Sequence, residues 1–283
     1  MKFNPRDFTW GLELEFGDVP RNLTPPYSKW SDRETDIVNT IHPYYAVAAD
    51  PLGISPAIGG ELNTKPTTTI EKQTELVSSI LSYFKENDTT PTASCVSHTH
   101  VHVHIPNLSN ELLEVKKLLV FIYNNQDEMI THANPCTINE NLNEYIVDYL
   151  KNDSRRKYPR DHIVHLLQRK TFGEFYSDLL INKKKISNYE APKKYFINLL
   201  SLQDNETIEF RFFNSTTNIN EIKNTMRFCY SVLDAAFNDK KIDYTIQLPK
   251  FNYDRELLLG WFHTKHTLLT DKPKRRIRQE TIM

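Results

Sequence analysis

The chain has 283 residues, of which 39% are hydrophobic and 25% charged, and these proportions are ordinary for a globular protein. A formal net charge of −1 excludes a global basic field for nucleic acid, and no apolar run approaches the length of a membrane span. The three cysteines form no CxxC pair, so we expect core thiols in a reducing compartment and a cytoplasmic location. No GxGxxG or GxxxxGK[ST] phosphate loop occurs, so a nucleotide would have to be bound without one.

The first part of the chain predicts short strands and one long helix. GLELEF at 11–16 alternates apolar and acidic residues and predicts a half-buried strand. Short strands are also expected at 46–50 and 60–64, separated by a turn rich in proline and glycine. A capping box with Thr68 as its first residue then begins a helix that ends near Asn87.

The later part continues the mixture of strands and helices. A histidine-rich strand at 95–105 is followed by a helix at 110–131. The segments 195–202 and 207–213 predict a hairpin, and a long helix follows over 220–237. Because hairpins neighbour one another along the chain, an α+β fold with an antiparallel sheet is favoured over a doubly wound α/β fold.

The domain organisation predicted from this order is simple. No internal repeat and no linker is evident, so we expect a single domain over 1–283. Its motifs lie at about 10–237, and 238–283 forms a helical and basic extension that ends in KPKRRIR. That basic cluster is either a solvated tail or a contact for an anionic substrate or a nucleic acid.

Carboxylate, imidazole and guanidinium groups share one face of several predicted strands. These polar residues are Glu13, Glu15, Glu61, His100, His102, Glu209 and Arg211. Because residues i and i+2 of a strand project from the same face, neighbouring strands would gather them into one site. Carboxylates at that density repel one another, and divalent cations relieve the repulsion. A site of carboxylates with an imidazole suits Mg²⁺ or Mn²⁺ better than a structural zinc.

The motifs that carry these residues resemble those of the amidoligase family. In chain order they are GLELEF, A-x-x-A-D, GGELNTKP, the HVHV strand and INLLSL followed by TIEFRFFNSTTN. The family comprises carboxylate–amine ligases of the glutamine synthetase and glutamate–cysteine ligase superfamily. The resemblance implies a glutamine-synthetase-like fold, with a curved, mainly antiparallel sheet and helices on its convex face. It also implies that the concave face holds ATP and two or three ions of Mg²⁺ or Mn²⁺.

The resemblance further implies an activity and individual roles. Such an enzyme phosphorylates a carboxylate with ATP and lets an amine displace the phosphate, which forms an amide. The residues that match metal ligands are Glu13, Glu15, Glu61, His100 and Glu209. His102 matches a residue near the nucleotide or substrate, Arg211 one that meets the transferred phosphate, and Asp50 one that binds and helps deprotonate the amine.

Two departures from the family pattern leave alternatives open. The family continues its aspartate with Gly-Ser, whereas Asp50 is followed here by Pro-Leu-Gly, so the register of Asp50 is open. His98 stands where the family commonly has glycine, and His98 and His104 have no counterpart. A register shifted by two residues would make His102 and His104 the histidine pair.

The expected partners are a small-molecule or peptide carboxylate and an amine, with a glutamine amidotransferase as a candidate protein partner. A nucleic-acid substrate is compatible with the family but is not indicated by the sequence. Other functions are a metal-dependent hydrolase that uses the histidine and glutamate cluster without ATP, and a non-catalytic binding module with a ligase fold. A guanidino phosphotransferase, which stops after phosphoryl transfer, fits the His-x-His strand less well.

Overall fold

The computed structural model describes residues 4, 7–16, 42–44, 60–91, 93, 98–133, 157–181 and 195–250. Its centre is an open six-stranded sheet in the order β2-β3-β1-β4-β6-β5, in which each neighbouring pair is antiparallel. The strands are β1 (Thr9–Phe16), β2 (His42–Tyr44), β3 (Gly60–Asn63), β4 (His98–His104), β5 (Ile197–Asn198) and β6 (Thr207–Asn214). The mixture of helices with an antiparallel sheet confirms the expected α+β class.

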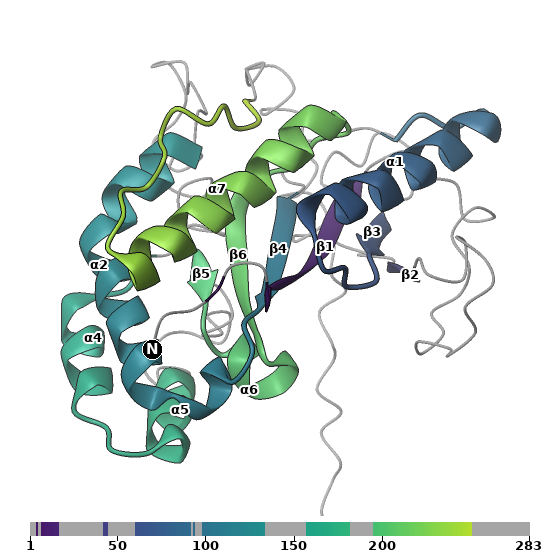
Figure 1. The fold of residues 1–283 in the computed structure, drawn as a ribbon. Coiled ribbons are helices and arrows are strands. Elements are labelled where there is room, and N and C mark those ends of the chain that lie inside the picture. Colours follow the sequence, from purple (N-terminus) through teal and green to yellow (C-terminus); the bar gives the residue numbers. More distant parts are fainter. Residues whose placement is uncertain are drawn as a thin grey trace, which may run out of the picture.

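Three long helices cover one face of this sheet. They are α1 (Ile70–Glu86), α2 (Leu112–Ala133) and α7 (Ile219–Asn238). Helices α1 and α7 lie side by side, and α1, α2 and α7 contact β1, β6 and β4 respectively (Figure 1). Helix α4 (Arg160–Leu167) packs against α2, and α5 (Phe172–Ile181) packs against α4. Helices η4 (Leu108–Asn110) and α6 (Ser201–Asn205) are short connections next to the strands.

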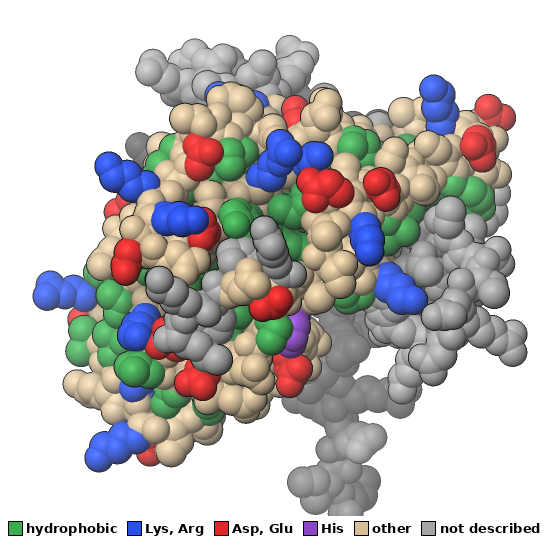
Figure 2. Space-filling view, viewed as in Figure 1, with side chains coloured by type: hydrophobic (Ala, Val, Ile, Leu, Met, Phe, Trp, Pro, Cys, Tyr) green, Lys and Arg blue, Asp and Glu red, His purple; other side chains and the backbone are tan. Residues whose placement is uncertain are grey.

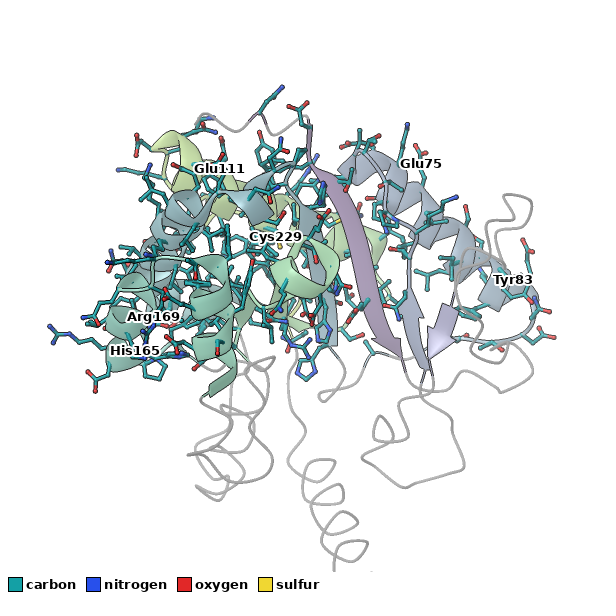
Figure 3. All side chains as sticks on the ribbon, turned by 90° about the horizontal axis from the view of Figure 1, so that it is seen from below. Glu75, Tyr83, Glu111, His165, Arg169 and Cys229 are labelled. Carbon is teal, nitrogen blue, oxygen red and sulfur yellow. The ribbon has the colours of Figure 1, made fainter. Side chains whose placement is uncertain are left out.

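The core lies between the helices and the sheet, as the alternating strand patterns predict. Leu12 and Leu14 of β1 and Val101 and Val103 of β4 are at most 1% exposed. Cys229 of α7 is also buried and free, and burial raises the pKa of its thiol. Figure 3 shows Cys229 in the interior, far from the outer edge where α4 and α5 lie. The expectation of core thiols is confirmed for Cys229, and the other two cysteines lie outside the described residues.

A β-bulge interrupts the pairing of β4 with β6. The register moves from Val101↔Phe210 to Thr99↔Phe213, so β6 has two residues where β4 has one. The extra residue returns Phe213 to the apolar face, where its ring meets that of Phe228 on α7 nearly edge-on at 6.2 Å between centroids. Strict alternation would instead have turned Phe213 toward the polar face.

The first strand of the predicted hairpin, expected at 195–202, is shorter than predicted and spans only Ile197–Asn198. Strand β5 ends at Asn198, because the side-chain Oδ1 of Asn198 accepts a hydrogen bond from the Leu200 amide at 3.0 Å and turns the chain. Helix α6 then joins β5 to β6 in place of a simple turn. The strand expected at 46–50 and the basic cluster of the extension lie outside the described residues.

The helix-covered face has a mixed charge. Figure 2 shows acidic and basic side chains interspersed over the described part of this face, which agrees with the near-zero net charge. None of the helices that the structure describes is long and apolar enough to cross a bilayer.

The cap of α1 supplies a test of the fold. The structure places Thr69, and not Thr68, at the N-cap, where its side-chain oxygen accepts a hydrogen bond from the Lys72 amide at 3.2 Å. Thr69→Ala should therefore lower the free energy of unfolding by about 1 kcal/mol in urea denaturation. Thr68→Ala, the matched control at the exposed neighbouring position, should change it by less than about 0.5 kcal/mol. A larger loss for Thr68→Ala would show that the helix begins one residue earlier.

Candidate functional site

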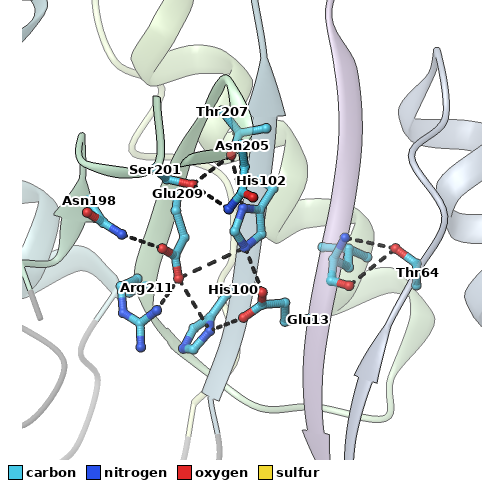
Figure 4. A network of polar contacts seen from close by, with 11 residues as sticks. Glu13, Thr64, His100, His102, Asn198, Ser201, Asn205, Thr207, Glu209 and Arg211 are labelled. Carbon is cyan, nitrogen blue, oxygen red and sulfur yellow. Dashed lines mark hydrogen bonds and ion pairs between the residues drawn. The ribbon is translucent and has the colours of Figure 1, made fainter. Parts of the chain in front are cut away.

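The polar faces of β1, β4 and β6 meet at the middle of the sheet. Glu13 of β1 is paired with His100 of β4, and His102 of β4 is paired with Glu209 of β6. Because the central strand β4 pairs with β1 on one side and with β6 on the other, a carboxylate flanks the two histidines on each side (Figure 4). Residues almost 200 positions apart in the sequence thus form one cluster.

The two imidazoles bridge the two carboxylates. The Nδ1 atom of His100 lies 2.8 Å from Oε2 of Glu13 and 3.7 Å from Oε1 of Glu209. The Nε2 atom of His102 lies 3.0 Å from Oε1 of Glu13 and 3.9 Å from Oε1 of Glu209. His100 and Glu209 are only 3% and 5% exposed, so these contacts form largely away from bulk water.

Burial and ion pairing shift the pKa values of this cluster in opposite directions. Burial by itself would raise the pKa of Glu13, but its hydrogen bonds and electrostatic interactions with His100 and His102 outweigh it and hold this pKa well below its ordinary value. Burial lowers the pKa of His102, but the Glu13 and Glu209 carboxylates outweigh it, so the net shift is upward. The carboxylate of Glu13 and the imidazolium of His102 therefore stabilise each other.

Two further residues contact Glu209. The Nη1 atom of Arg211, two positions along β6, bonds Oε1, and the side-chain amide of Asn198 donates to Oε2 at 2.6 Å. Arg211 is among the site residues predicted from the sequence, whereas Asn198 is not. A polar amide within the apolar run FINLL is the signal that could have revealed it, because asparagine is depleted in strands.

His102 and His104 make further contacts with the region around the start of β6. The Nδ1 atom of His102 lies 3.2 Å from Oγ1 of Thr207, which is itself 2.8 Å from Oγ of Ser201. The Nδ1 atom of His104 lies 3.0 Å from the backbone carbonyl of Glu206. The structure thus places His100 and His102 beside the two glutamates, and His104 beside the backbone of the turn that precedes β6.

The other predicted site residues are placed less completely. Glu15 of β1 and Glu61 of β3 are paired in the strand register, but their side chains lie outside the described part of the structure. Asp50 lies outside the described residues altogether. The His98 ring stacks on the ring of His100, with 6.2 Å between their centroids.

Comparison with protein families identifies the chain. A family model described as "Putative amidoligase enzyme" matches residues 28–233, more than two thirds of the sequence. The chain belongs to this amidoligase family. The matched region contains β4 and β6 but begins after β1, so Glu13 lies outside it. Glu13 is placed in the cluster by the pairing of β1 with β4.

No curated protein matches the chain. Among solved structures, this amidoligase family member is similar to a bifunctional glutathione synthetase from Pasteurella multocida, with 13% sequence identity and a TM-score of 0.44. The similarity covers 93% of this chain and 41% of that one, so the chain spans less than half the length of the synthetase.

The donor atoms of the cluster fit a divalent cation. Glu13, His100 and Glu209 each offer one ligand atom, and these atoms lie within 4.8 Å of one another. Within the described ranges they form the one such group of three or more histidine, cysteine or acidic residues. Two carboxylate oxygens with one imidazole nitrogen suit Mg²⁺ or Mn²⁺, and no thiolate is present among them to select a softer metal.

The ion pair of the cluster predicts how stability depends on pH without metal. Glu13 stabilises the fold above its ordinary pKa of 4.5, and this contribution is lost as the pH falls toward its lowered pKa. His102 stabilises the fold fully below its ordinary pKa of 6.5, and this contribution is lost as the pH rises through its raised pKa. The melting temperature in a chelator should therefore be highest between these limits and fall as the pH rises above 6.5.

Matched glutamine variants test this pH dependence. His102→Gln should abolish the fall in melting temperature above pH 6.5, whereas His104→Gln, whose imidazole meets a backbone carbonyl, should preserve it. Below that pH, His102→Gln should lower the free energy of unfolding by about 1.5–3 kcal/mol, as for loss of a hydrogen bond to a charged group. An unchanged profile in His102→Gln would contradict the assigned ion pair.

Proposed function

We propose that the protein is an ATP-dependent carboxylate–amine ligase that forms an amide or isopeptide-type bond through an acyl phosphate. The observation that carries this proposal is the cluster of half-buried Glu13 with buried His100 and Glu209, together with the Arg211 guanidinium on Glu209, in a chain of the amidoligase family. Carboxylates that could hold cations and a guanidinium for a phosphoryl group are the side chains that such a reaction needs.

The proposed fold is glutamine-synthetase-like, with α1, α2 and α7 on the convex face of a curved sheet. These helices contact the strands whose apolar residues are buried, and the cluster uses the alternate strand positions. The concave face would then be the polar one. We further propose that the whole chain forms a single catalytic domain.

The residues proposed to hold the cations are Glu13, His100 and Glu209, joined by Glu15 and Glu61 for a second or third ion. When bound, Mg²⁺ or Mn²⁺ would neutralise the phosphate oxygens of ATP and so reduce their repulsion of an attacking carboxylate. The pairing of Glu15 with Glu61 in the register of β1 and β3 supports their inclusion.

Arg211 has the chemistry for the first half-reaction. In this step an oxygen of the substrate carboxylate attacks the γ-phosphorus of ATP, the bond to the β-phosphate oxygen breaks, and ADP leaves. The Arg211 guanidinium, which lies about a quarter exposed at the edge of the cluster, would stabilise the oxygens of the transferring phosphoryl group. The imidazole of His102, whose pKa is raised, would add a second interaction with the anionic nucleotide or substrate when it is protonated.

The second half-reaction needs a base. The amine nitrogen attacks the acyl carbon, the carbon–nitrogen bond forms, phosphate leaves, and the nitrogen loses a proton. We propose Asp50 for holding the amine and accepting that proton, on the resemblance alone. A small-molecule or peptide carboxylate and an amine, with a glutamine amidotransferase as a candidate partner, remain the proposed substrates and partner.

An assay for nucleotide turnover tests the proposal. Purified protein with ATP, Mg²⁺ and pools of carboxylates and amines should release ADP and phosphate only when both pools are present. Arg211→Lys should lower kcat by about 10³-fold with a small effect on KM for ATP, because the loss falls on transition-state charge.

Paired glutamine variants control this assay. Glu209→Gln should abolish ADP release, whereas Glu206→Gln, the same change at an exposed position three residues earlier, should retain it. Turnover that persists in Glu209→Gln would contradict the proposal. Hydrolysis of the pool compounds without ATP would instead support a metal-dependent hydrolase.

A further inference from the structure

The two carboxylate oxygens of Glu209 have different partners. Oε1 faces the cluster, 3.7 Å from His100 and 3.9 Å from His102, and also contacts Arg211. Oε2 accepts the side-chain amide of Asn198 at 2.6 Å. Because the terminal torsion of a glutamate is soft, either oxygen could be turned toward the cluster unless a neighbour fixes the carboxylate.

Asn198 is itself held at both ends of its amide. Its Oδ1 accepts the Leu200 backbone N–H at 3.0 Å, which assigns the amide nitrogen to Glu209. Asn198 is 3% exposed, and its backbone is the direct antiparallel partner of Glu209 in the β5–β6 pair. The donor therefore has little freedom to move away from the carboxylate.

A buried aromatic group fixes the strand that carries Asn198. The hydroxyl of Tyr158 donates to the carbonyl of Ile197 at 2.7 Å, and Tyr158 is 1% exposed. Its ring stacks on that of Tyr195, with 4.1 Å between the centroids. This packing anchors the two-residue strand β5, which is too short to be held by its ladder hydrogen bonds alone.

We infer that Asn198 is a positioning residue that fixes Glu209 so that Oε1 alone is presented to a divalent cation. The amide of Asn198 is neutral, so it performs this role without adding a second positive charge to that of Arg211 on the Glu209 carboxylate. The inference rests on the metal site of the proposed function and assigns to this chain an outer residue that determines how one ligand binds.

Asn198→Ser separates this role from the structural one. A serine hydroxyl can still accept the Leu200 N–H two residues on, but it is too short to reach Glu209. Mn²⁺ binding, measured by calorimetry on the full chain, should weaken by about 10–100-fold, as expected for loss of a partner of a metal ligand. The melting temperature of Asn198→Ser should lie nearer the wild type than that of Asn198→Ala, which lacks both bonds.

Two controls make the result specific. Asn205→Ser makes the same change in the adjacent helix α6, where the side chain is exposed and contacts Oγ of Ser201 at 3.5 Å, and it should leave Mn²⁺ affinity unchanged. In a Glu209→Gln background, Asn198→Ser should cause no further loss, because both changes act through the same carboxylate.

Other outcomes would overturn the inference in distinguishable ways. Wild-type Mn²⁺ affinity in Asn198→Ser, or an equal loss with and without Glu209, would remove the positioning role and leave the metal site standing. Absence of Mn²⁺ binding by the wild-type protein would remove the metal site as well, and the proposed function with it.

Discussion

The contact of 2.8 Å between Nδ1 of His100 and Oε2 of Glu13 joins β4 to β1 at the centre of the sheet. The other charged groups of the site lie around this contact. The Glu13 and Glu209 carboxylates both lie near the imidazole of His102 and raise its pKa, and the Arg211 guanidinium bonds Glu209. Isolated buried carboxylates would be costly, whereas paired ones can be kept ionised. The same arrangement keeps a set of oxygen and nitrogen donors close together, which is what a divalent cation requires.

The surrounding structure serves to hold these donors in register. The bulge in β6 lets Glu209 lie on the polar face while Phe213 returns to the core against α7. Asn198 bonds the Glu209 carboxylate, and the stacked Tyr158 anchors the short strand that carries Asn198. The site is thus supported by regular sheet and buried aromatic packing, the kind of framework that preorganises catalytic groups.

The alternation of the strands allowed much of this to be predicted. The alternation predicts the buried and the polar face of each strand. In β1 the buried face carries Leu12 and Leu14 and the polar face Glu13. In β4 the buried face carries Val101 and Val103, opposite His100 and His102. Which strands pair, and in which register, is harder to predict from the sequence, because it depends on contacts between strands far apart in the chain. The bulge could not be predicted, because nothing in the FRFF run indicates where a residue is inserted into the pairing. The role of Asn198 could not be predicted either, because its side chain acts on a partner in another strand.

We propose that Glu13, His100 and Glu209 together bind a divalent cation that neutralises the phosphates of ATP. Anomalous diffraction from crystals grown with Mn²⁺ and a non-hydrolysable ATP analogue tests it most directly. We expect a manganese peak coordinated by these three side chains, with the phosphates of the analogue bound on the same face of the sheet. A nucleotide bound elsewhere, or manganese held only by other residues such as His98 or His104, would contradict it.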